Sequence, residues 1–209
     1  MNNKINAKTV AFTGMLGALS AVLMMFNFPV PFVPSFLKFD IAELPALFAG
    51  FILGPISGCF VIIVKIALKL VIQGTDTAFV GEAMNMVASL AFILPASIIY
   101  RFYHTKKGAL VSLVVSTLFV SVVCVVVNAY ISFPMYSKLY GLSMDKIIKM
   151  GAAVNPFVHD SFSLMLYGVL PFNIIKYAAT SFITYIFYKK CANVLRSTLG
   201  IAIKRDGNR

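Results

Sequence analysis

The chain alternates between long apolar runs and short polar or basic stretches. A helix that crosses a lipid bilayer needs about 20 predominantly apolar residues in succession. Four runs come close to that length, at 10–28, 82–103, 108–131 and 168–188. Each of them predicts one membrane-spanning helix.

A fifth apolar run, at 41–72, is too long for a single crossing. Glycines and a proline divide it at Gly50, Gly54, Pro55 and Gly58. Such residues favour a tight turn, because glycine adopts unusual backbone angles and proline cannot continue a helix. We therefore expect two short helices here, and the whole pattern predicts an all-α membrane protein with a bundle of six transmembrane helices.

Three irregular segments separate these helices. Prolines interrupt 28–34, a short polar loop occupies 73–77, and a long mixed segment spans 132–167. The prolines lack a backbone donor and so forbid a regular helix in the first segment. The third segment is long for a plain connection, which is typical of functional loops, and its sequence Lys146-Ile-Ile-Lys149 predicts a short interfacial helix.

Composition and charge also indicate a membrane protein. Of the 209 residues, 60% are hydrophobic and 12% are charged, whereas a soluble domain is about half apolar and about a quarter charged. The net charge of +11 comes from basic clusters between the apolar runs, which is typical of loops facing anionic lipid headgroups and argues against nucleic-acid binding. We expect a single membrane domain over 1–209 with both termini cytoplasmic, at 1–9 and in a basic tail at 192–209. The three irregular segments then share the outer face.

Catalytic and metal-binding motifs are not evident in the sequence. Cys59, Cys124 and Cys191 lie in or at the ends of apolar runs without metal-ligand spacing, so we interpret them as packing residues. His104 and His159 have no neighbouring nucleophile or carboxylate array of known spacing. A glycine-rich phosphate-binding loop is also missing, so we expect no ATP hydrolysis by this chain alone, and no metal or cofactor.

Three polar residues fall inside the last two predicted spans. Lys176 lies well within the final span, where burying a charge is costly, so it is a candidate functional residue. Asn173 precedes it by three positions and shares its helix face, and Asn128 lies in the outer half of the preceding span. Their donors and acceptors match a planar heterocycle with alternating carbonyl and N–H groups. The alternative is that the asparagines join helices while Lys176 extends to the outer headgroups.

Two carboxylates begin the second predicted helix. Asp40 can cap its exposed N–H groups, and Glu43 in its first turn also favours a helix N-terminus. Capping does not exclude ligand contact, because carboxylates accept hydrogen bonds from hydroxyl groups. Glu43 lies one turn deeper and is the better ligand candidate.

Further polar residues lie near the outer ends of the third and fourth predicted helices. Lys65 and Lys69 are one turn apart, and Glu82 and Asn85 form a second pair three positions apart. We expect Lys69 to extend outward and the deeper Lys65 to pair with an acid such as Glu82. Glu82 and Asn85 are also candidates to line a cavity.

Small residues in the first span form a possible contact surface. Gly14 and Ala18 are four positions apart, a spacing that lets another helix approach closely. Ala7 and Ala11 show the same spacing. Packing within the bundle is the alternative explanation for both pairs.

Several of these segments together resemble the substrate-binding (S) components of energy-coupling factor (ECF) transporters, and specifically their riboflavin-specific members. The resemblance covers nearly the whole chain. It rests on the stretch Phe36-Leu-Lys-Phe-Asp-Ile-Ala-Glu-Leu-Pro-Ala-Leu, the turn Gly50…Gly54-Pro55, the stretch Gly81-Glu-Ala-Met-Asn85, Asn128, and Asn173-Ile-Ile-Lys176.

The resemblance implies a riboflavin-binding subunit without enzymatic activity, with riboflavin as transported ligand. Asn128, Asn173 and Lys176 would contact the pyrimidine edge of the flavin ring, and Glu43 and Asp40 would accept ribityl hydroxyls. Phe39 and Asn85 complete the implied substrate-binding set, and the proline-rich segment would cover the pocket.

The resemblance also implies partners and a location. Riboflavin would be captured at the outer face of a prokaryotic cell membrane, and a transmembrane coupling (T) component with two ATPases would supply the energy. The S component would topple within the membrane to release its ligand. Its contact with the T component would fall on Gly14 and Ala18, with Ala7 and Ala11 as the alternative.

Other functions compete with this interpretation. An S component for another vitamin or precursor, of the pantothenate, folate or thiamine type, would keep the family and change the site roles. A small intramembrane enzyme would use Glu82, His159 or Asp160 as acid or base, although these residues form no convergent set in the sequence. A self-sufficient secondary transporter would favour internal repeats, and none is found.

Overall fold

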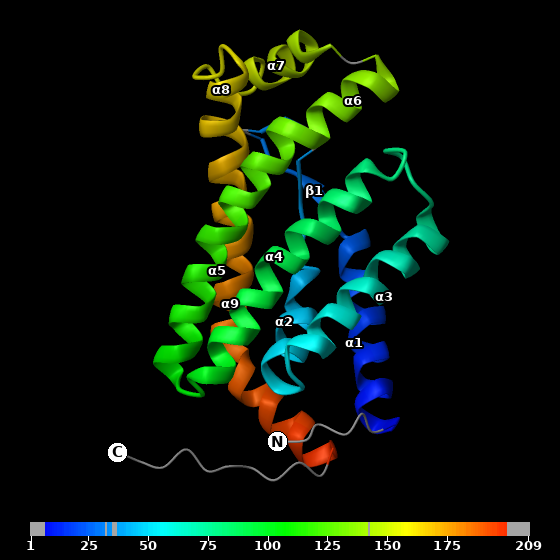
Figure 1. Cartoon of the computed structure of the whole chain (residues 1–209), viewed down its shortest axis with the longest axis vertical. Helices are drawn as coiled ribbons and strands as arrows, with labels where there is room; N and C mark the ends of the chain where they lie inside the picture. The colour runs from blue at the N-terminus through cyan, green and yellow to red at the C-terminus, as the bar shows by residue number, and fades with distance from the viewer. Residues whose placement is uncertain (1–6, 32, 35–36, 142, 200–209) are drawn as a thin grey trace.

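The protein is almost entirely helical in a computed structural model that describes residues 7–31, 33–34, 37–141 and 143–199 (Figure 1). In this part of the chain, five helical segments are long and apolar enough to cross a membrane. These are Ala7–Met25, Pro55–Gln73, Val80–Phe102, Lys106–Leu139 and Ser161–Lys190. The chain is therefore a helical membrane protein.

The turn predicted at Gly54-Pro55 is confirmed. Helix α2 (Glu43–Ile52) precedes the turn, and helix α3 (Pro55–Gln73) starts at the proline itself. Gly54 has φ of 110°, a conformation that side chains disfavour. The two helices are not equally short, however. With 10 residues α2 is too short to span a bilayer alone, whereas α3 has 19 residues.

The fifth predicted span is longer than expected. Helix α5 (Lys106–Val127) continues through a π-helical turn, η1 (Asn128–Ser132), into α6 (Phe133–Tyr140). The prediction that it ends at residue 131 was wrong, because the Phe133 N–H donates to the Asn128 carbonyl and carries the helix past Pro134. A wider turn of this kind accommodates a proline that lacks its own donor.

The final span is also longer than expected. It begins at α8 (Ser161–Leu164), passes a second π-helical turn, η2 (Met165–Val169), and continues as α9 (Leu170–Leu199). The predicted start at residue 168 was wrong. Asp160 caps the helix instead, since its carboxylate accepts from the Ser163 N–H at 2.7 Å.

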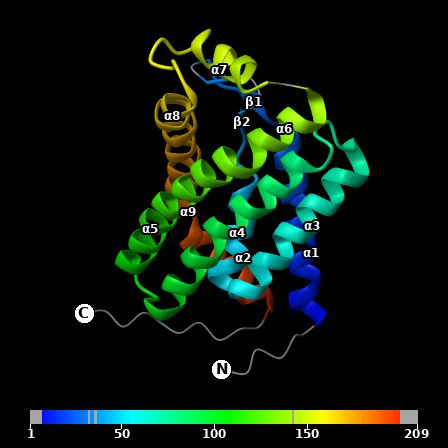
Figure 2. The ribbon, with the colours of Figure 1, turned by 45° about the horizontal axis from the view of Figure 1, so that its top comes forward.

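The remaining elements gather at one end of the bundle. A short antiparallel hairpin pairs β1 (Phe28–Pro29) with β2 (Lys38–Phe39), and the Phe28 and Phe39 rings lie 5.3 Å apart. Helix α7 (Met144–Ala152) is the short helix predicted around Lys146. Figures 1 and 2 show the hairpin, α7 and the α3–α4 turn at one end, opposite the start of α1 (Ala7–Met25) and the end of α9. The three irregular segments therefore share one face.

Glycines bring the central helices close together. A Cβ on Gly50 would lie 2.0 Å from the Ser97 Oγ of α4 (Val80–Phe102), and one on Gly17 would lie 2.5 Å from the Val64 Cγ1 of α3. Real atoms do not approach so closely, so α2 and α4, like α1 and α3, pack backbone to side chain at these positions. The core around Phe92 and Ile93 forms where α2, α3 and α4 meet.

Candidate ligand-binding cavity

A cavity of about 460 Å³ opens at the end that carries the hairpin. Its walls come from α1, residues 38–40, α3, the α3–α4 turn, α4, α6, α7 and α9. Pockets for small molecules commonly fall between about 300 and 1,000 Å³. A cavity bounded by so many elements, with polar groups in an apolar wall, has the size and character of a small-molecule site.

A buried ion pair between distant parts of the chain lies in this cavity. The Lys176 Nζ lies 2.8 Å from Asp40 Oδ2, and the two side chains are 8% and 6% exposed. Asp40 Oδ1 also accepts from the Ala42 N–H at 3.0 Å, just before α2 begins. Burial raises the pKa of Asp40. The charge and hydrogen bond of Lys176, the charge of Lys65 and the Ala42 N–H together lower it by more, so the pKa lies below its ordinary value. Both predicted site residues are thus brought together as an ion pair.

The two candidate asparagines are also buried. Asn128 donates through Nδ2 to the Cys124 carbonyl, and Asn173 donates to the Val169 carbonyl, each at 2.8 Å. These bonds fix the orientation of each amide and use one of its two N–H donors. Neither asparagine belongs to the lining of the cavity described above. Both asparagines are buried, but neither contributes to the cavity wall, and their convergence with Lys176 on a ligand stays a prediction.

Glu43 takes part in a second buried network. Its Oε1 accepts from Lys65 Nζ at 2.8 Å, and Ser89 Oγ lies 2.8 Å from both groups. Asn85 Oδ1 lies 3.4 Å from the same hydroxyl and also lines the cavity. The expected pairing of Lys65 with Glu82 was wrong. Glu43 is fully buried and lies behind the cavity wall, because α2 places it opposite Lys65.

Glu82 instead organises the rim of the cavity. It pairs with Lys69 and accepts from Thr75 Oγ1 at 3.0 Å and Thr77 Oγ1 at 2.9 Å. Lys69, which we expected to extend outward, also donates to the Gly74 carbonyl at 2.9 Å. These bonds attach the α3–α4 turn to both helices. The rim on this side is therefore held by an ion pair and several hydrogen bonds.

Some lining residues were missed by the sequence interpretation. Lys38, Asp76 and Tyr136 line the cavity, while the predicted Phe39 lies against Phe28 in the hairpin. They come from the hairpin, the α3–α4 turn and α6, which meet at one end of the bundle. No pattern within a single helix could have revealed it.

The small residues of α1 divide between two faces. Gly17 and Ala21 are buried against the bundle, whereas Ala18 is exposed. Gly14 is half-buried, and a Cβ there would meet no atom within 4 Å. The pair Gly14 and Ala18 thus lies on an outer surface of the bundle, and its use by a partner stays a prediction.

Comparison with known proteins identifies similar chains. The family described as the ECF transporter substrate-specific component matches residues 8–188. The riboflavin transporter RibU of Staphylococcus aureus (strain TCH60) is 28% identical over 94% of this chain and 96% of its own length. The riboflavin transporter FmnP of Bacillus subtilis (strain 168) is 31% identical over 82% of this chain and 85% of its own. A solved structure of the S component of a bacterial ECF transporter superposes with a TM-score of 0.70 at 28% identity, covering 90% of this chain and 98% of that one.

Proposed function

The chain belongs to the substrate-specific components of ECF transporters, and from this premise we propose that it is the riboflavin-binding subunit of such a transporter. Members of this family bind a substrate for a transporter and are not enzymes. Relatives named as riboflavin transporters over most of their length support riboflavin as the ligand.

The observation that carries the proposal is the charged pair of Lys176 and Asp40 inside the cavity. A buried lysine with a fixed carboxylate partner presents its remaining N–H donors in a defined direction. Those donors suit the carbonyl oxygens of a flavin ring. Burial of the flat ring against apolar side chains supplies affinity, and the polar groups supply selectivity.

We assign different roles to the remaining site residues. Asn128 and Asn173 hydrogen-bond the pyrimidine edge once the ring enters beside them. Asp40 and Asn85, which already line the cavity, are the acceptors for ribityl hydroxyls. Glu43 neutralises Lys65 from behind the wall and supports the site rather than contacting the ligand.

The hairpin is the proposed cover of the site. Phe39 and Phe28 pack on each other there, so the hairpin closes as one unit. Because prolines limit the conformations of 28–34, ordering this segment over a ligand costs little entropy.

The proposed topology has six helices, with α2 completing the five long segments. A single domain over 1–209 spans the cell membrane of a prokaryote several times, with 1–9 and 192–209 in the cytoplasm. The T component and two ATPases then complete the importer. The surface of Gly14 and Ala18 is the proposed contact with the T component.

A fluorescence-quenching titration of the purified protein with riboflavin tests the proposed function. Binding into an apolar cavity should quench flavin emission, and preparations from riboflavin-grown cells should be yellow. Pantothenate, folate and thiamine serve as competitors that test an S component for another vitamin. A colourless protein that leaves riboflavin emission unchanged, or that one of these compounds saturates first, would refute the assignment.

A further inference from the structure

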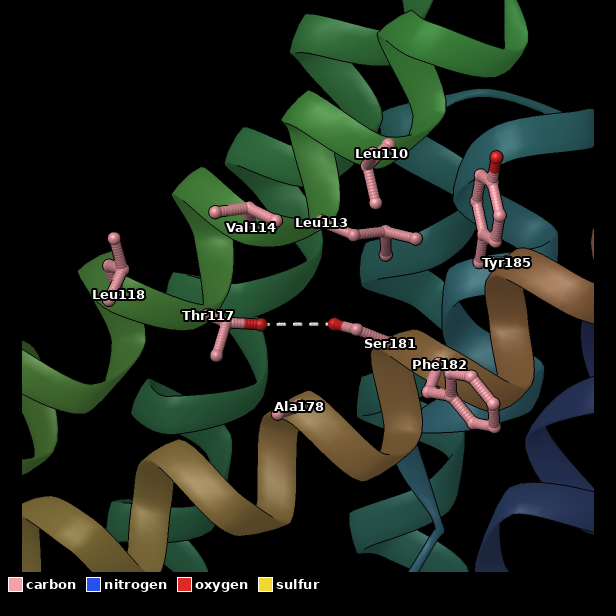
Figure 3. Close-up of a pocket in the computed structure, with 9 residues that line it drawn as sticks. All are labelled: Leu110, Leu113, Val114, Thr117, Leu118, Ala178, Ser181, Phe182 and Tyr185. Carbon is pink, nitrogen blue, oxygen red and sulfur yellow. Dashed lines mark hydrogen bonds between the residues drawn. The ribbon is translucent and has the colours of Figure 1, made fainter.

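A second cavity lies on the outside of the bundle, between α5 and α9. It has a volume of about 300 Å³ and shares no residue with the ligand-binding cavity. Figure 3 shows Leu110, Val114 and Leu118 along α5, with Ala178 and Phe182 facing them from α9. These side chains are exposed. In a membrane they face lipid, and we call this feature the α5–α9 groove.

The base of the α5–α9 groove contains no unpaired hydrogen-bonding group. Thr117 and Ser181 lie on its floor, and their hydroxyls bond to each other at 3.0 Å (Figure 3). An apolar chain can therefore cover them without leaving a polar atom unsatisfied. From Leu110 to Leu118 the groove is about 12 Å long at 1.5 Å per helical residue, which is long enough to hold part of an acyl chain.

Positive charge gathers at one end of this groove. Lys106 and Lys107 precede Leu110 by about one turn of α5, and Lys189 follows Tyr185 by about one turn of α9. Both helix segments lie at the same end of the bundle (Figure 1). Within residues 97–112 and 178–199 the sequence has no acidic residue. Lys106 and Lys107 therefore have no acidic neighbour along α5 or at the end of α4.

We propose that the α5–α9 groove binds one anionic glycerophospholipid. One acyl chain lies along the groove, and the phosphate headgroup lies against Lys106 and Lys107. Tyr185 stands at the boundary between them, a position where aromatic side chains with a polar tip are common. Such a site holds the acyl chain in the α5–α9 groove and the phosphate at the lysines together. This distinguishes it from the diffuse attraction of any basic membrane surface.

Native mass spectrometry of the purified protein in a neutral detergent tests this proposal. The probes are palmitoyl-oleoyl phosphatidylglycerol and the phosphatidylcholine with the same chains. Wild-type protein should retain one phosphatidylglycerol and prefer it about tenfold or more over phosphatidylcholine. The double variant Lys106→Gln/Lys107→Gln should lose most of that preference. Lys146→Gln/Lys149→Gln, which removes as many charges from α7, should behave as wild type.

Filling the groove separates a site from surface charge. Ala178→Phe and, from the other wall, Val114→Phe keep every lysine and should each abolish retention of the lipid. Riboflavin binding reports that each variant is folded, because the ligand-binding cavity lies elsewhere. Retention that survives both substitutions would overturn the proposal and leave only diffuse charge. Equal retention of the two lipids by wild type would also overturn it. So would groove variants that keep the lipid but no longer associate with the T component, because the groove would then be a protein contact.

Discussion

The pair formed by Lys176 and Asp40 makes the sharpest prediction about this protein. Lys176→Met keeps the apolar stem and removes the charge, which leaves the Asp40 carboxylate buried without its cation. Because the two side chains are only 8% and 6% exposed, water cannot fully replace the lost partner. Breaking a buried ion pair from one side costs about 3–5 kcal/mol of folding free energy. Asp40→Asn combined with Lys176→Met removes both charges and should recover much of that loss.

The assay is a double-mutant cycle on the ligand-free protein, with unfolding by sodium dodecyl sulfate followed by circular dichroism. A positive coupling free energy between the two positions is expected, since each residue stabilises the charge of the other. Lys146→Met on α7 is the control, because that lysine is exposed and should change stability by less than about 0.5 kcal/mol.

Riboflavin titration of the same variants separates the structural role of Lys176 from its role in binding. In the double variant, restored stability with weak flavin binding would show that the pair contacts the ligand in addition to stabilising the fold. A Lys176→Met protein that unfolds like wild type would refute the ion pair. A double variant no more stable than Lys176→Met would refute the cause given for the loss.

Two further predictions follow from the same structure. Asn128→Ala and Asn173→Ala should each weaken riboflavin binding by about 1–3 kcal/mol, because a buried ligand group loses its partner; unchanged titration curves for both would remove the ring contacts. Gly14→Leu should leave riboflavin binding intact and block cellular uptake, since a side chain there meets open space on the proposed partner surface. Gly17→Leu should instead lower stability, because its Cβ would lie 2.5 Å from Val64 Cγ1, and normal uptake by Gly14→Leu would place the partner surface elsewhere.

Local sequence was sufficient to locate the long helices and to identify the class of protein. Bilayer thickness sets the length of an apolar run, so the long helices could be located without knowing their neighbours. The turn at Gly54-Pro55 was predictable for the same reason, because backbone chemistry alone disfavours a helix there. Lys176 was recognisable as a candidate because a charge within such a run is costly wherever it points.

Helix ends near prolines depended on tertiary structure. The segment after Asn128 continues as a helix because a π-helical turn accommodates Pro134. Packing against the rest of the bundle decides whether such a turn forms. The hairpin likewise pairs Phe28 with Phe39 in a register that the irregular sequence between them does not specify.

The pairing of charges was decided only by the folded structure. Lys176 and Asp40 are 136 positions apart in the sequence. Lys65 pairs with Glu43 and not with Glu82, the partner expected from the sequence. A lysine can bond any carboxylate within reach, so its chemistry limits the type of partner but not the identity. The packing of α2, α3 and α9 sets the distances. The sequence therefore determined which side chains could form the site, and the tertiary structure determined which of them meet.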